Sequence, residues 1–333
     1  TYAWFALNLA WAALSVWLSA AACRVGFTAR RVLLAACAVL LWRPVADLLL
    51  YGQATLLVAT AGLVAAWCLA RQRPVAAGLA ALVTASKPQA TILLLLGLMV
   101  WEWRRGSLRF TLACAASAVV ACLAAVALAP DWPAGLLHYH PADAVHDYWG
   151  YYVTTRILLS MALGEGRLTD VLYGAAAAAG VCAMLVLWWR TRVTPLYPAA
   201  ITLAATPLLA PIFNTYDYVV LILPLVLAFV VLTRRAAPAA PLGAAALGVL
   251  AWFATSADRW LRRLIEPDPV WTAAQRVLGE EGTNRLWTYL RWDSRFLALL
   301  LPAALLVVLI VRRQDVVAML EGAPAAPASS EAH

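Results

Sequence analysis

Long apolar stretches separated by short basic turns run along most of the chain. Two of them, residues 2–23 and 110–130, match the roughly 20 residues that an α-helix needs to cross a ~30 Å hydrocarbon layer. Their apolar positions are continuous rather than alternating, and they are rich in Ala and Leu, which favours helices over membrane strands. The pattern therefore predicts an all-α, polytopic transmembrane protein.

Arginine clusters between the apolar stretches give an expected orientation, because basic turns stay on the cytoplasmic side of a membrane. These clusters are Arg24, Arg30 and Arg31; Arg71 and Arg73; Arg104, Arg105 and Arg109; Arg190 and Arg192; Arg234 and Arg235; Arg312 and Arg313. Threading the chain between them predicts nine full crossings, at residues 2–23, 32–50, 53–70, 107–129, 168–189, 195–211, 218–233, 237–254 and 296–311. We expect one transmembrane domain over residues 1–321 and a disordered, low-complexity tail over 322–333.

Residues 75–103 lie between two cytoplasmic clusters, so they must make an even number of crossings. Lys87-Pro88 interrupts them, since proline lacks an N–H and disfavours helix in the residue before it. Each arm then has about 12–15 residues, or roughly 18–22 Å of helix, which is short for a full crossing. The segment predicts a short helical hairpin whose tip, residues 85–89, stops within the membrane.

Lys87 is the only lysine of the chain. A lysine that faces lipid at mid-membrane costs on the order of 3 kcal/mol. It is tolerated if the side chain snorkels to the far interface, or if it faces a polar cavity with an anionic partner. We favour the second interpretation, in which Lys87 is the cation of an anion site embedded in the membrane.

The composition excludes two other classes of protein. The 333 residues are 64% hydrophobic and only 13% charged, which is more apolar surface than a soluble core can use. The net charge of +8 comes from arginine clusters between apolar segments, which is typical of loop anchors and not of a nucleic-acid-binding surface. The six cysteines lack metal-ligand spacing and are interpreted as small buried hydrophobic residues.

The predicted external loop 131–166 holds three of the four histidines. His138 and His140 have a spacing that would ligate a metal if a carboxylate joined them, but no second tight pair accompanies them. We therefore expect an interfacial loop anchored by aromatic residues, with no metal site and no cofactor. Arg156 is the cation close behind those aromatic residues and is a candidate to meet a phosphate.

Residues 208–224 place Asn214, Thr215, Tyr216 and Asp217 at the outer end of two apolar segments. Asp217 is a candidate general base or acceptor for a sugar hydroxyl. It is equally a candidate N-terminal cap for a helix that begins near Tyr218, and the two roles are compatible. Charges of both signs in the loop 255–295 predict a surface helix over residues 272–291.

Within residues 48–106 the chain resembles the signature region of glycosyltransferase family 87, bacterial membrane enzymes of the GT-C class. The likeness rests on Gly52-Gln53, residues 71–74, Ala77-Gly78 and Lys87-Pro88. A later block, with residues 210–212, Tyr216-Asp217-Tyr218 and residues 221–224, is similar to a second region of the family. The resemblance covers most of the chain, although only these two blocks are specific.

The resemblance implies a hexosyltransferase that works on the extracytoplasmic side of the cell membrane. It implies a polyprenyl-phosphate sugar donor, usually of mannose, and a lipid-linked or glycan acceptor, in an inverting and metal-independent reaction among membrane lipids. Such a reaction needs a carboxylate to take the acceptor proton, and donors or cations to stabilise the departing phosphate. The residues expected near phosphate and sugar are Gln53, Lys87, Arg156, Asn214 and Tyr216.

Two departures from the family pattern affect the expected base. The family's base lies in a first external loop, and this chain begins in what aligns with the next helix. Either the first helix and its loop lie upstream of Thr1, which is what we expect, or the protein lacks its own base. In the later block some members carry histidines where this chain has Tyr216-Asp217. Asp217 and Asp47 are therefore the candidate bases within the chain.

Two further functions stay open at this point. One is a lipid or glycan transporter, which should show paired repeats with broken helices in corresponding positions. The sequence has one Lys-Pro break and no convincing second copy. The other is a non-catalytic partner subunit that holds the lipid carrier.

Overall fold

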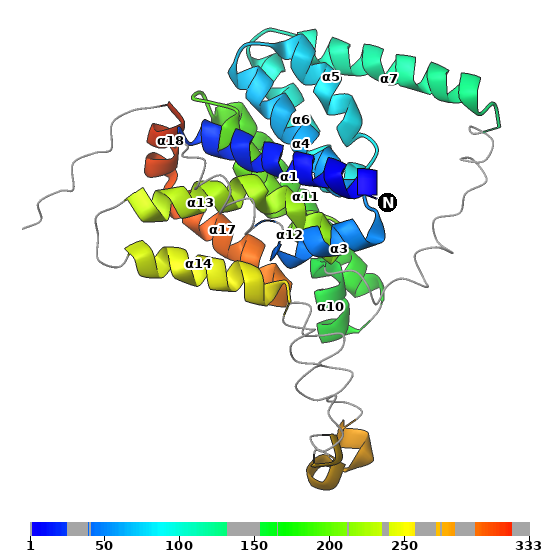
Figure 1. Cartoon of the computed structure of the whole chain (residues 1–333), viewed down its shortest axis with the longest axis vertical. Helices are drawn as coiled ribbons and strands as arrows, with labels where there is room; N and C mark the ends of the chain where they lie inside the picture. Colours follow the sequence, from blue (N-terminus) through cyan, green and yellow to red (C-terminus); the bar gives the residue numbers. More distant parts are fainter. Residues whose placement is uncertain are drawn as a thin grey trace, which may run out of the picture.

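The computed structural model describes residues 2–24, 39, 41–131, 154–164, 166–211, 213–234, 240–256, 271–273, 275–283 and 297–321. These residues form helices, with no strand among them, so the all-α prediction is confirmed. In chain order the helices are α1 (Tyr2–Ala22), α3 (Arg43–Tyr51), α4 (Thr55–Ala70), α5 (Pro74–Thr84), α6 (Pro88–Arg104), α7 (Arg109–Leu128), α10 (Thr155–Leu163), α11 (Arg167–Arg190), α12 (Leu196–Leu209), the 3-10 helix η2 (Thr215–Leu221), α13 (Ile222–Arg234), α14 (Ala240–Ala254), α17 (Leu300–Val311) and α18 (Arg313–Glu321) (Figure 1).

The lengths of these helices bear on the number of membrane crossings. In the described part, four segments are long and apolar enough to cross a membrane: α1, α7, α11 and the run of η2 into α13. The number rises to six if the bent pairs α3–α4 and α17–α18 each count as one span. Helices α12 and α14 have 14 and 15 residues, which is fewer than a perpendicular crossing needs. The prediction of nine full spans is therefore not confirmed.

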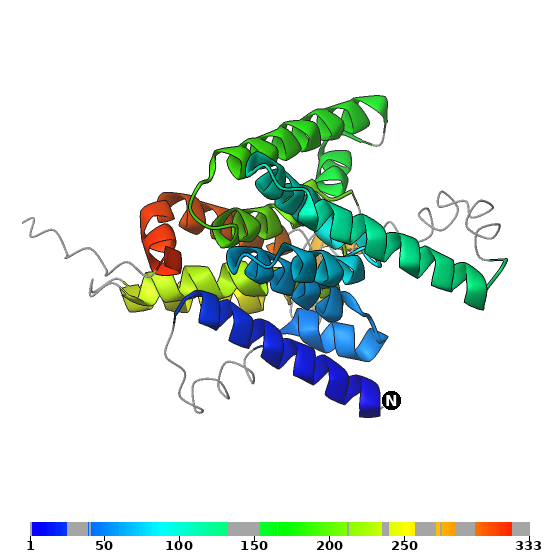
Figure 2. The ribbon, with the colours of Figure 1, turned by 90° about the horizontal axis from the view of Figure 1, so that it is seen from above.

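Helices α7 and α11 expose apolar side chains along most of their length. Only Phe110 and Ser117 are buried in α7, and only Thr169 and Trp188 in α11. Figure 2 shows both helices at the periphery of the bundle, with α7 extending past its neighbours. An apolar face of this size would be unfavourable in water, and it is what helices that contact lipid present.

The chain breaks between α5 and α6 at the predicted place. Lys87 is the N-cap of α6 and Pro88 is its first residue, where a missing N–H loses no hydrogen bond. The two helices have 11 and 17 residues, so the second is longer than expected. They also diverge: α5 packs mainly on α4 and α7, whereas α6 packs mainly on α12 and α11. The segment is a helical hairpin in connectivity, and its arms are held by different neighbours.

Helix α12 lies at the centre of the described bundle and is buried from residue 196 to residue 207. It contacts α6, α17, α11 and α13, and Figure 1 shows it surrounded by these helices. Because η2 follows it after a short turn, α12 fixes the position of residues 214–217. Those residues carry the chemistry described in the next subsection.

Glycines let two helix pairs approach closely. A Cβ atom on Gly78 of α5 would lie 2.5 Å from the Cβ of Ala113 on α7. A Cβ atom on Gly97 of α6 would overlap the indole of Trp188, which is fully buried and donates a 2.9 Å hydrogen bond to Thr202. Small residues of this kind allow the close backbone packing on which membrane helices depend.

Several sequence predictions concern segments that lie wholly or partly outside the described residues. They include the histidine loop with His138, His140 and His146, and the tail 322–333. The predicted surface helix over 272–291 is helical in its described part, at residues 271–273 and 275–283.

We expect Gly97→Ala to lower the thermal unfolding temperature of the detergent-purified protein. The added methyl group forces α6 away from Trp188, and overpacking of this kind costs about 1–3 kcal/mol. Gly174→Ala is the matched control, because a Cβ at Gly174 on α11 meets nothing within 4 Å and alanine favours helix. Equal unfolding temperatures for the two variants would contradict the packing described here.

Candidate active site

A buried ion pair joins the turn between α5 and α6 to η2. The Nζ atom of Lys87 lies 2.5 Å from Oδ1 of Asp217. The side chain of Asp217 has no exposed surface, and that of Lys87 is 14% exposed. The only lysine of the chain therefore meets a carboxylate, and its side chain keeps a small exposed surface.

Thr55, the first residue of α4, completes a closed set of three side chains. Its hydroxyl donates to Oδ1 of Asp217 at 3.2 Å and accepts from the ammonium of Lys87 at 2.6 Å. The backbone N–H of Asn214 donates to the other carboxylate oxygen at 3.0 Å. Both oxygens of Asp217 thus have donors, which is the condition under which a buried charge is tolerated.

Asp217 also helps to start η2. Asn214 is the N-cap, its side chain accepts from the backbone at the third helical position, and Asp217 at that position accepts from the backbone of Asn214. The prediction of a capping role was right in kind but wrong in position, because Asp217 is the third residue of the capping box and Asn214 is the cap. The same carboxylate therefore holds Lys87 and the beginning of η2.

Tyr216 covers the ammonium from another side. The Nζ atom of Lys87 lies 4.4 Å from the centroid of the Tyr216 ring, within the range of a cation–π contact. The phenol oxygen of Tyr216 accepts a 2.9 Å hydrogen bond from the side-chain amide of Asn214. The ring of Tyr51, at the exposed end of α3, lies 6.2 Å from that of Tyr216. Two tyrosine rings therefore flank the accessible side of the cluster.

A second pair of charges lies next to the first. Nε of Arg43 lies 3.1 Å from Oδ2 of Asp47, one turn later on α3, and Asp47 is buried. The hydroxyl of Thr215 donates to the same oxygen at 3.4 Å. Since Thr215 directly precedes Tyr216 and Asp217, η2 links the two carboxylates.

Gln53 lies in the sharp bend between α3 and α4. The two helices meet at 120°, and Gly52 ends α3 with a φ of +63°, a conformation that glycine adopts without strain. The N–H of Gln53 then donates to the carbonyl of Leu48 at 3.1 Å. This bend places Gln53 two residues before Thr55, and its side chain is partly buried.

Arg156 forms its described ion pair away from the Lys87–Asp217 cluster. It lies in the first turn of α10, and its Nη2 atom is 2.7 Å from Oδ1 of Asp170 on α11. None of the contacts described for the Lys87–Asp217 cluster involves it. The structure thus brings together Lys87, Tyr216, Asp217 and Asn214, with Asp47 and Gln53 beside them, and it leaves Arg156 with Asp170.

Two members of the site were not singled out from the sequence. Thr55 has no local signal, because a lone threonine at the start of an apolar helix is common. Arg43 and Asp47 have the four-residue spacing of a helical ion pair, and this spacing could have identified Arg43. Within the described residues, no group of three or more histidine, cysteine or acidic side chains is placed to hold a metal ion.

We expect Asp217→Asn to lower the unfolding temperature far more than Asp170→Asn. Removing one partner of a buried pair leaves the other charge without compensation, which costs about 3–5 kcal/mol, whereas an exposed pair contributes about 0–1 kcal/mol. Thermal unfolding in detergent measures both. A double variant, Lys87→Met with Asp217→Asn, should recover part of the loss, and no recovery would contradict the pairing.

The comparisons with known proteins give one match. The model of glycosyltransferase family 87 matches residues 1–215, which is well over half of the chain and contains Asp47, Gln53 and Lys87. No curated protein and no solved structure matches the chain.

Proposed function

Because the chain belongs to glycosyltransferase family 87, we propose that this membrane glycosyltransferase transfers a hexose from a polyprenyl-phosphate donor. Mannose is the proposed sugar, and the acceptor is a lipid-linked or extracytoplasmic glycan. The reaction is inverting and metal-independent. The observation that carries the proposal is the largely buried ammonium-bearing side chain of Lys87, 14% exposed and held in an apolar bundle by Asp217 and Thr55.

A fixed cation suits the leaving group of this reaction. The polyprenyl phosphate gains negative charge as its bond to the sugar breaks, and a preorganised donor in a water-poor site stabilises that charge. Lysine has three N–H donors, and in the described structure Asp217 and Thr55 take two of them. The third is proposed to meet a phosphate oxygen. The tyrosine rings beside it offer a flat surface for the sugar.

The bond changes follow from inversion at the anomeric carbon. The acceptor hydroxyl oxygen forms a bond to that carbon from one face, while the bond between the carbon and the phosphate oxygen breaks on the other. The hydroxyl proton passes to a carboxylate, and the phosphate departs with the bonding electrons towards Lys87. Gln53 and Asn214 are proposed to bind sugar hydroxyls. Arg156 is proposed to bind the phosphate-bearing lipid carrier.

The two carboxylates are proposed to differ in role. Both oxygens of Asp217 already accept hydrogen bonds, and its charge is matched by Lys87, so it best serves as a positioning residue that orients the ammonium. Asp47 is then the candidate base within this chain. It lies next to the cluster, through Thr215, and Arg43 holds its side chain in place.

The proposed extracytoplasmic side of the reaction rests on the length of α4. This helix of 16 residues begins at Thr55 in the cluster and ends before Arg71, so about 24 Å separates the two ends. The positive-inside rule places Arg71, and the arginines gathered with it such as Arg104 and Arg192, on the cytoplasmic side. The cluster then lies near the opposite face of a multi-pass protein, where lipid-linked sugars are used.

A transporter, or a non-catalytic subunit that holds the lipid carrier, is the alternative function. The observation that favours it is the burial of both carboxylates. Under this alternative Lys87 would still bind the phosphate, and no sugar would move. Transfer assays with a labelled donor therefore separate it from the proposed function.

We expect Lys87→Met to reduce sugar transfer by about 10²–10³-fold, the usual effect of losing one donor that stabilises a developing negative charge. The assay follows label from polyprenyl-phosphate mannose into lipid-linked product in membranes, per amount of folded protein. Arg190→Gln is the matched control, since Arg190 is exposed at the far end of α11. A wild-type rate in Lys87→Met would remove Lys87 from the site. If the native protein moves no sugar from any polyprenyl phosphate, the enzyme hypothesis fails.

We expect Asp47→Asn to lower kcat by about 10²–10⁴-fold with little change in the KM for the donor, because a base acts in the transition state. Initial rates across donor concentration separate the two constants. If the KM for the donor rises and kcat stays unchanged, Asp47 is assigned to donor binding instead.

A further inference from the structure

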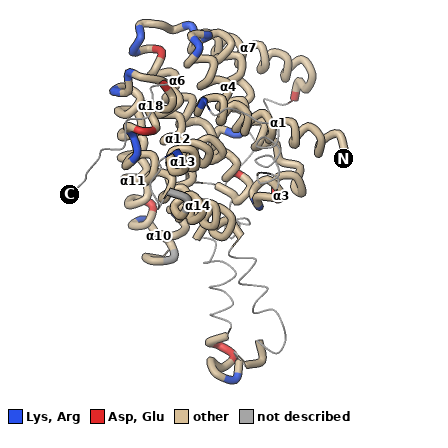
Figure 3. Tube along the Cα trace, turned by 60° about the vertical axis from the view of Figure 1, so that its left-hand side comes forward, with Lys and Arg blue, Asp and Glu red and all other residues tan. Residues whose placement is uncertain are grey.

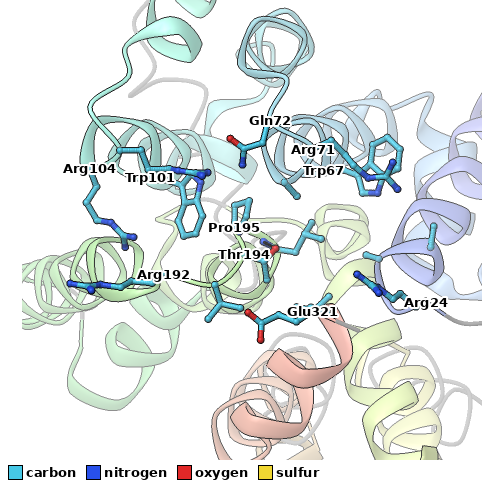
Figure 4. A pocket seen from close by; sticks show the side chains of 17 residues that line it. Arg24, Trp67, Arg71, Gln72, Trp101, Arg104, Arg192, Thr194, Pro195 and Glu321 are labelled. Carbon is cyan, nitrogen blue, oxygen red and sulfur yellow. Dashed lines mark hydrogen bonds between the residues drawn. The ribbon is translucent and has the colours of Figure 1, made fainter. Parts of the chain in front are cut away.

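A charged pocket lies at the end of the bundle opposite the Lys87–Asp217 cluster. It has a volume of about 380 Å³ and is lined by the ends of α1, α4, α6 and α18 and by the turn between α11 and α12 (Figure 4). Figure 3 shows basic residues gathered along this side of the described helices. The arginines that line the pocket are Arg24, Arg71, Arg104, Arg105 and Arg192, and Glu321 is the one acidic side chain with them in the described lining.

Three of these arginines, Arg71, Arg104 and Arg105, contact neutral groups that leave their charge uncompensated. Arg104 donates to the backbone carbonyls of Trp189 and Thr191. The guanidinium of Arg71 lies 4.4 Å from the ring centroid of Trp67, and those of Arg104 and Arg105 lie 5.4 and 5.8 Å from that of Trp101. Carbonyls and ring faces are neutral, and none of the five arginines forms an ion pair within the described part of the chain.

Two other side chains, Gln72 and Glu102, lie beside these arginines. The side-chain oxygen of Gln72, with its amide turned to satisfy both groups, accepts from Arg105 at 2.9 and 3.2 Å. Glu102 is buried and lines a neighbouring pocket of about 580 Å³ together with Gln72 and Arg105. Even with Glu102 and Glu321 counted, the positive charge of this end exceeds the negative charge.

Trp101 supplies an independent observation. It is only 2% exposed, it lines the pocket, and its Nε1 donor has no hydrogen-bond partner among the described residues. A buried donor without a partner costs about 1–3 kcal/mol unless a ligand or water satisfies it. Planar guanidinium groups beside a further N–H donor are a preferred arrangement for phosphate oxygens.

We propose that this pocket binds a phosphate group, separately from the sugar-transfer site, and that the bound group ties together the ends of α1, α4, α6, α11 and α18. The phosphate belongs to the headgroup of an anionic lipid or to a soluble phosphate compound. The location suits a headgroup, because the pocket lies where apolar helices end in tryptophan and arginine, the composition of a membrane interface. Binding to the folded state alone stabilises that state.

The test is thermal unfolding of the full chain, purified in detergent and stripped of lipid. Phosphatidylglycerol should raise the unfolding temperature by several degrees in a saturable way, whereas zwitterionic phosphatidylcholine should not. A rise with inorganic phosphate of the same size would assign the soluble source. No rise with either anion overturns the proposal.

Matched variants show whether the rise depends on the pocket. Arg71→Gln with Arg105→Gln should abolish it, while Arg190→Gln with Arg313→Gln should keep it. Arg190 ends α11 and Arg313 begins α18, and both are exposed and do not line the pocket. If both double variants lose the lipid-dependent rise in unfolding temperature equally, the rise reflects general attraction to a basic surface, and the proposal is overturned.

Trp101→Phe is a milder probe that removes the N–H donor and part of the indole but keeps an aromatic ring at this position. It should weaken binding of the anion several-fold while the protein remains folded. The readout is ligand-dependent unfolding and not sugar transfer, so failure here leaves the proposed glycosyltransferase activity untouched, and failure of that activity leaves this site untouched.

Discussion

The ion pair between Lys87 and Asp217 connects segments that no local interaction would bring together. An ammonium or a carboxylate alone inside an apolar bundle costs several kcal/mol, so each needs the other before the helices around them close. The turn between α5 and α6, the start of α4 and the start of η2 must therefore meet at one point. The bend after Gly52 and the central position of α12 make that meeting possible.

The same helices carry two kinds of positive charge at their two ends. At the beginning of α4 and α6 the charge of Lys87 is matched by a buried carboxylate, and only a small part of the lysine side chain remains exposed. At the other end, arginines contact carbonyls and indole rings and stay uncompensated. Both arrangements suit phosphate groups, the first in a water-poor site and the second at an interface. The two proposals therefore place a carrier phosphate that reacts and an anion that only stabilises the bundle at different ends.

Much of the fold follows from local signals in the sequence. Pro88 marks the start of α6, and the long apolar runs predict α1, α7 and α11 within one or two residues. The arginine clusters predict which helix ends share a side, and several of them line one pocket. The prediction of nine crossings is not confirmed. Helix α12 and the bent pair α3–α4 are apolar enough for a membrane span, but hydropathy does not show that a helix is short or bent.

Sequence alone established an apolar helical protein, a helix break at Lys87-Pro88 and the resemblance to glycosyltransferase family 87, because caps, proline and hydrophobic runs act over a few residues. Only the tertiary structure decided that Lys87 pairs with Asp217 through Thr55, that Arg156 pairs with Asp170, and that α5 packs on α4 and α7 instead of on α6. Those choices depend on which apolar faces and small residues fit together across the bundle. This complementarity involves segments that are far apart in the sequence, so the sequence of any one segment does not reveal it.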